Sequence, residues 1–143
     1  MNIKDKIYKI REEYIMLDSD LAELYDVETK RINEAVKNNP LKFPERYSFK
    51  LSNEESKMFL VENFDQKIKL EKRGGRYKNP RVFTEQGVAM LSTILKSKIA
   101  TKVSIRIMDA FVEMRKYIYS NLINQDYYNI MTVRHDNEIK LLQ

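Results

Sequence analysis

The sequence predicts an α+β fold, a winged helix-turn-helix-like core with small β-hairpins and a long C-terminal helix. Apolar and polar residues alternate over residues 7–11 and 47–51, which is the pattern of half-buried strands. Two short amphipathic stretches meet at a tight turn within residues 19–38. From Ile99 to Ile118, apolar residues recur every three or four positions, as they do on the buried face of a helix.

Length and composition restrict the class of protein. The chain has 143 residues, 43% of them hydrophobic and 33% charged, which suits one domain with an appended element. It has no cysteine, so disulfides and thiolate zinc sites are excluded. No stretch of about 18 apolar residues suggests a membrane span, and the N-terminus lacks an apolar signal region. We therefore expect a cytoplasmic protein that does not contact membranes.

A strand pair and a helix pair are predicted first along the chain. Residues 7–17 read as two extended segments, and Asp18 or Ser19 is positioned to cap the helix that follows. The apolar stripes of the two helices consist of Leu21, Ala22, Leu24 and Tyr25, and of Ile32, Ala35 and Val36. Asp26 and Val27 form the turn between them, and the second helix runs from Glu28 or Thr29 to about Asn38. This spacing is typical of a DNA-binding helix-turn-helix, although a purely structural helical hairpin has the same pattern.

The middle of the chain predicts a strand and a capped helix. Tyr47, Phe49 and Leu51 alternate with polar residues and are expected to point inward. Ser52 and Glu55 match a capping box at the start of the next helix. The buried stripe of that helix is expected to contain Met58, Phe59, Val61 and Phe64.

The excess positive charge is concentrated in residues 66–81. Seven cations and one anion give this segment a charge of +6, whereas the whole chain carries +5. We predict a basic β-hairpin here, with Gly74 and Gly75 at its tip and Val82 and Phe83 beyond it. Such a hairpin would act as a wing on DNA, and a solvated loop without a DNA role is the alternative.

Two further helices are predicted in the C-terminal part. Thr84 is expected to cap a helix in which Val88, Ala89, Leu91, Ile94 and Leu95 are buried and Gly87 permits close packing. After a break at Lys96 and Ser97 comes the longest helix, with a buried stripe of Ile99, Val103, Ile107, Phe111, Met114 and Ile118. Residues 1–117 are assigned to the domain, and residues 118–143 to a helical arm for homodimerisation or for linkage to a further domain. No helix stop signal is present at the end of the sequence, so we expect it to belong to a longer protein.

Several blocks of the sequence resemble the ORF6N domain, which belongs with the KilA-N and Bro-N group of phage and mobile-element DNA-binding domains. The blocks occur in order between residues 5 and 117, and they are residues 16–25, 28–37, 43–44, 49–51, 74–76, 83–91 and 107–111. Two departures are Asp26, where glycine is common, and Asn38-Asn39-Pro40, where the family has a more basic segment. The resemblance implies a DNA-binding module of phage or prophage proteins, some of which are regulators or antirepressors.

Candidate DNA-binding residues lie on the second helix of the pair and on the basic segment. Lys30 is suited to guanine or phosphate, Asn33 to adenine, and Thr29 to phosphate or a thymine methyl group. Arg31 and Lys37 are expected to contact the DNA backbone, as are Arg73, Arg76 and Lys78 of the predicted wing.

We therefore predict sequence-specific binding to double-stranded DNA by a phage- or prophage-type regulator or antirepressor in a bacterial cytoplasm. The alternative is an interaction module that binds a repressor protein, for which Tyr117, Tyr119, Tyr127 and Tyr128 would suit an interface. An enzyme is not expected, because the chain lacks cysteine, has His135 as its one histidine and has no glycine-rich phosphate loop. No cofactor, metal or small-molecule substrate is predicted.

Overall fold

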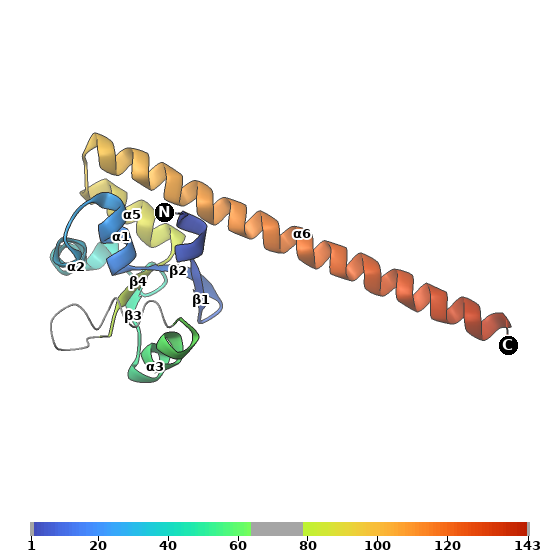
Figure 1. Ribbon diagram of the computed structural model, residues 1–143. Coiled ribbons are helices and arrows are strands. Elements are labelled where there is room, and N and C mark those ends of the chain that lie inside the picture. The colour runs from blue at the N-terminus through green and yellow to red at the C-terminus, as the bar shows by residue number, and fades with distance from the viewer. Residues whose placement is uncertain (1, 64–78, 143) are drawn as a thin grey trace.

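A four-stranded antiparallel sheet, in the order β1-β2-β4-β3, organises the domain. The computed structural model describes residues 2–63 and 79–142, and the helices lie around the sheet (Figure 1). The α+β class is confirmed. The elements are η1 (Ile3–Lys6), β1 (Tyr8–Ile10), β2 (Glu13–Leu17), α1 (Asp18–Tyr25), α2 (Thr29–Asn38), η2 (Pro40–Lys42), β3 (Ser48–Lys50), α3 (Asn53–Glu62), β4 (Arg81–Phe83), α5 (Glu85–Ile94) and α6 (Lys98–Leu142).

The predicted strand pair is confirmed as the β1–β2 hairpin. Tyr8 pairs with Ile15, and Ile10 pairs with Glu13. Arg11 and Glu12 connect the strands with φ values of 54° and 64°, the geometry of a two-residue hairpin turn. Since neither residue is glycine, this turn is strained, and the Arg11 side chain offsets the strain by contacts outside the hairpin. Its guanidinium lies 4.2 Å from the centre of the Phe49 ring.

Strand β4 is the central strand of the sheet. Phe83 pairs with Met16 of β2 on one side and with Ser48 of β3 on the other. Val82 and Phe83 are fully buried. These two residues were predicted to lie beyond the tip of a basic hairpin, and they lie in strand β4, both edges of which are occupied by β2 and β3. Gly74 and Gly75, the predicted tip, lie outside the described residues.

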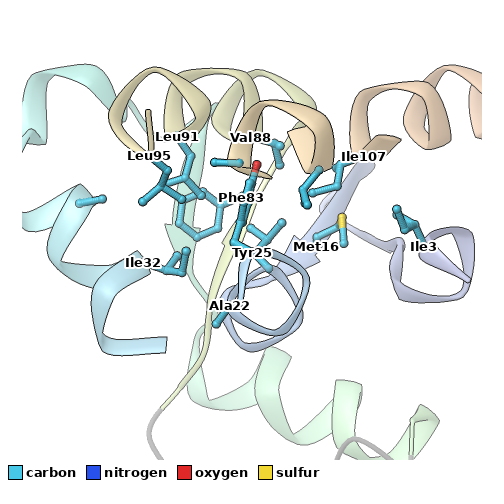
Figure 2. Close-up of a cluster of buried hydrophobic side chains, with 14 of the residues drawn as sticks. Ile3, Met16, Ala22, Tyr25, Ile32, Phe83, Val88, Leu91, Leu95 and Ile107 are labelled. Carbon is cyan, nitrogen blue, oxygen red and sulfur yellow. The ribbon is translucent and has the colours of Figure 1, made fainter. Parts of the chain in front are cut away.

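The two faces of the sheet bury separate hydrophobic cores. Successive strand residues point to opposite faces, so Met16 and Phe83 enter one core while Ile15 and Val82 enter the other. Figure 2 shows the first core, in which side chains from α1, α2, α5 and α6 converge on Phe83. The helix pair is therefore held against the sheet by the larger of the two cores.

Helix α3 covers the second core with fewer side chains than predicted. The capping box of Ser52 and Glu55 is confirmed. Phe59 is buried against Tyr8 in an edge-to-face contact. The burial of Met58 and Val61 was wrongly predicted, since these side chains are 63% and 84% exposed. The reason is that one turn of α3 reaches the sheet edge and leaves the other sides of the helix in solvent.

Helices α5 and α6 largely follow the predicted pattern. Thr84 caps α5 by accepting a hydrogen bond from the Gly87 amide. On α6, Val103, Ile107 and Phe111 are buried, whereas Ile99 is exposed, contrary to the prediction. Ile99 lies in the first turn of α6, on the side away from the core. None of the described helices combines the length and apolarity that crossing a membrane requires.

The stability of the fold is expected to depend on pH through Glu55. A hydrogen bond from Arg11, whose Nε lies 2.8 Å from Oε2, lowers the pKa of Glu55 from 4.5 to about 2. A lowered folded-state pKa means that the carboxylate stabilises the fold above pH 4.5, and that this contribution is lost as the pH falls toward 2. Because Arg11 is partly exposed, we expect the ionised Glu55 to contribute about 1–2 kcal/mol to the free energy of unfolding.

Chemical denaturation of Glu55→Gln and wild type at several pH values would measure this effect. The stability difference between them should shrink as the pH falls through the acidic range. Glu54→Gln, which changes an exposed neighbour in the same turn, is the control. A difference between Glu55→Gln and wild type that stays constant over this range would contradict the assignment.

Candidate nucleic-acid interface

The geometry of the α1–α2 pair is that of a helix-turn-helix. Asp26 ends α1 in the left-handed conformation, with φ 56° and ψ 47°, so it takes the role that glycine usually has. The Val27 amide donates to the carbonyl of Ala22 at 3.0 Å and closes the turn. Ala22 is buried, and its small side chain lets the two helices approach each other closely. The predicted turn is thus confirmed.

Asp18 joins three elements beside this helix pair. Predicted as a possible cap, it is instead the first residue of α1, and Leu17 occupies the cap position without a side-chain hydrogen bond. Its Oδ1 accepts from the Ser19 amide at 2.8 Å. Its Oδ2 accepts from Asn33 Nδ2 at 2.9 Å and lies 3.4 Å from the Arg81 amide. The buried carboxylate therefore connects the start of α1, the middle of α2 and the start of β4.

The outward face of α2 is basic but not uniformly so. Lys30, Arg31 and Lys37 are exposed, and Thr29 is half-buried at the first helical position. Lys30 Nζ lies 3.8 Å from Glu34, an exposed pair that is weak in water. Glu28 precedes the helix without capping it through its side chain. The lysines and the arginine are therefore available to an anion, while the two glutamates reduce the local positive charge.

Asn33 has a different environment from the one predicted for a base-reading residue. Its Nδ2 donates to Asp18 and, at 3.2 Å, to the carbonyl of Thr29. A bidentate contact with adenine uses this same amide nitrogen as the donor. In this structure Asn33 consequently orients α2. To contact adenine, its side chain would have to give up the hydrogen bonds to Asp18 and to the Thr29 carbonyl.

Two basic residues that were not among the predicted DNA contacts lie at the ends of β3 and β4. Arg81 and Lys50 are cross-strand partners in β4 and β3. Strand alternation places their side chains on the same sheet face as Phe83, which is the face covered by the helix pair. The alternation over residues 47–51 placed Lys50 on the face opposite Phe49, but the pairing of β3 with β4 could not be predicted.

Arg81 is held in place by its neighbours. Its Nη1 donates to Ser48 Oγ at 3.1 Å, and the side chain is half-buried. Burial lowers the pKa of Arg81 from its usual value, and the charge of Asp18 offsets part of this. Lys50 is directly opposite Arg81 in the strand register, and two like charges at such positions disfavour each other.

The remaining predicted contacts, Arg73, Arg76 and Lys78, lie outside the described residues. They precede β4, whose first residue Arg81 is anchored beside Asp18. Among residues 2–63 and 79–126, no group of three acidic or histidine side chains is arranged to hold a metal ion. The described candidate residues are therefore the exposed cations of α2 and the cross-strand pair Arg81 and Lys50, of which Arg81 is connected to α2 through Asp18.

A helix-turn-helix packed on a small antiparallel sheet defines an α+β domain. The chain belongs to the ORF6N domain family, whose model matches residues 5–94. This is a family of phage-type regulatory domains. Comparison with curated proteins and with solved structures found no significant match. The family match covers the helix pair, the sheet and the whole of α5, and it ends before α6.

Proposed function

We propose that this chain binds double-stranded DNA as a phage- or prophage-type transcriptional regulator, with α2 in the major groove. The observation that carries the proposal is the shared Asp18 oxygen, which accepts from Asn33 of α2 and lies 3.4 Å from the Arg81 amide, so that it holds the start of β4 beside α2. Lys50 is the cross-strand partner of Arg81. Phosphate contacts by Arg and Lys position a protein on DNA, and base contacts by the helix specify the site. A rigid basic strand end next to a helix-turn-helix supplies both kinds of contact.

In this proposal the described residues have separate roles. Lys30 and Thr29 lie in the first turn of α2, the part of a recognition helix that reaches base edges. Arg31 and Lys37 contact phosphates on either side of the groove. Arg81 and Lys50 contact a neighbouring phosphate, and its charge would relieve their mutual repulsion. Arg73, Arg76 and Lys78 extend this basic surface along the backbone.

Selection of duplexes from a random pool by the full chain tests the proposal. Enrichment of a defined site supports a sequence-specific regulator. Failure to enrich any site would overturn it and favour the second candidate, an interaction module for a repressor. That candidate is supported by Tyr117 and Tyr119, whose side chains are 66% and 67% exposed on α6.

The selected duplex then allows a test of Arg81. Arg81→Ala is expected to weaken binding by about tenfold and to reduce the salt dependence by about one phosphate contact. Arg106→Ala is the matched control, because it removes the same charge from an exposed position on α6. Fluorescence anisotropy at several salt concentrations measures both. Equal affinities of the two variants would remove Arg81 from the interface, and a thermal melt checks that each variant is folded.

A further inference from the structure

Helix α6 carries a second apolar stripe on the side opposite its buried face. The buried side chains are Ala100, Val103, Ile107, Ala110 and Phe111. At about 3.6 residues per turn, Ile105, Val112, Tyr119, Ile123 and Ile130 fall on one narrow stripe roughly half a turn away. Ile105, Tyr119, Ile123 and Ile130 are all about half exposed or more. Val112, where the helix passes over the domain, is half-buried.

The second stripe is not a continuation of the domain core. Figure 1 shows α6 passing over the domain and then extending away from it. On the buried face, the apolar series ends at Ile118 and continues with Asn121, Gln125 and Asn129. The outward stripe, in contrast, remains apolar as far as Ile130. The apolar side of the free part of α6 therefore points away from its own domain.

The residues of this stripe are arranged symmetrically about Asn121. Each residue before Asn121 has a counterpart at the same distance after it in the chain. The apolar pairs are Val112 with Ile130 and Tyr119 with Ile123, and the charged pair is Lys116 with Asp126. Two antiparallel copies that cross at Asn121 would set Lys116 against Asp126 of the second copy. In a parallel pair in register, Lys116 would instead meet Lys116 and Asp126 would meet Asp126. Charge complementarity thus selects the antiparallel arrangement.

We propose that the outward stripe of α6 binds the same stripe of a second copy of this chain, forming an antiparallel two-fold dimer. A closed two-fold pair uses one surface twice, which is what the symmetric arrangement provides. Tyr119 packs on Ile123 of the second copy, and Val112 packs on Ile130 of the second copy. The proposal does not depend on DNA binding, because the oligomeric state is measured without DNA.

Sedimentation velocity or light scattering of the full chain over a wide concentration range tests dimerisation. Wild type is expected to be a dimer, and Ile123→Glu to dissociate at least about tenfold more readily. Asn121→Glu adds the same charge on the opposite side of the helix and is expected to remain dimeric. Circular dichroism checks the helix content of both variants. A monomeric wild type, or equal dissociation of the two variants, would overturn the proposal.

Cross-linking tests the orientation, since the chain contains no cysteine of its own. Val112→Cys and Ile130→Cys proteins, mixed and treated with a short bifunctional thiol reagent, are expected to form the heterodimer. Each variant alone is expected to remain largely unlinked, because residue 112 lies far from residue 112 of the second copy. Efficient linking of Val112→Cys to itself would show a parallel pair and overturn the antiparallel arrangement.

Discussion

Gly87→Ala is expected to destabilise the domain by about 3 kcal/mol or more, the upper part of the range for overpacked cores. A Cβ atom at this position would lie 2.0 Å from the carbonyl oxygen of Tyr47. That oxygen has little freedom to move, because it accepts from the Thr84 amide at 3.0 Å and from Thr84 Oγ1 at 3.2 Å. The methyl group would therefore separate α5 from the segment before β3.

The direction of this effect makes the prediction specific. In a helix without a close neighbour, replacing glycine by alanine stabilises by about 1 kcal/mol. Gln86→Ala, an exposed change at the adjacent position of α5, is the control and should have a small effect. Urea unfolding measures both variants. A Gly87→Ala protein as stable as wild type would mean that α5 does not approach Tyr47 this closely.

Removing the Asp18 carboxylate is the second change with a large expected effect. Asp18→Ala removes the side-chain acceptor of the Ser19 and Arg81 amides. Asn33 Nδ2 loses one of its two acceptors and keeps the carbonyl of Thr29. Unsatisfied buried donors cost about 1–3 kcal/mol each, so we expect a loss of about 3 kcal/mol in the free energy of unfolding. Affinity for the selected duplex should also fall, because α2 and β4 lose their common anchor.

A double-mutant cycle separates this role from a general loss of stability. If Asp18 and Asn33 act through their bond, Asp18→Ala with Asn33→Ala should be less destabilising than the sum of the single changes. Asp109→Ala, at an exposed position on α6, should change neither stability nor binding. Additive effects of Asp18→Ala and Asn33→Ala would contradict the proposed junction.

The part of the site that could be predicted from the sequence depends on short-range patterns. The turn at Asp26, the caps at Ser52 and Thr84 and the start of α2 were all predictable. In each case the deciding contacts join residues at most five positions apart in the chain. The hairpin of β1 and β2 was predictable for the same reason, since alternation and a short connection define it.

Features that depend on distant partners could not be predicted. Asn33 was predicted to be available for a contact with adenine on an exposed helix face, yet its side chain is hydrogen-bonded to Asp18, which lies 15 positions earlier in the chain. Arg81 looked like the last charge of a basic segment, yet β4 inserts it between β2 and β3. Met58 and Val61 had the spacing of a buried stripe, but the side of α3 that faces the second core carries Ser56, Phe59 and Leu60 instead.

By itself, the sequence determined the class of the fold, the helix pair with its turn, and the concentration of positive charge in residues 66–81. Local hydrogen bonds and periodicity carry that information. Only the tertiary structure decided which basic residues outside α2 lie near it, because the buried Asp18 carboxylate connects Arg81 to α2 and strand pairing sets Lys50 opposite Arg81. It also decided which side of α6 stays uncovered, because the domain packs against one face of the helix and leaves the opposite stripe in solvent.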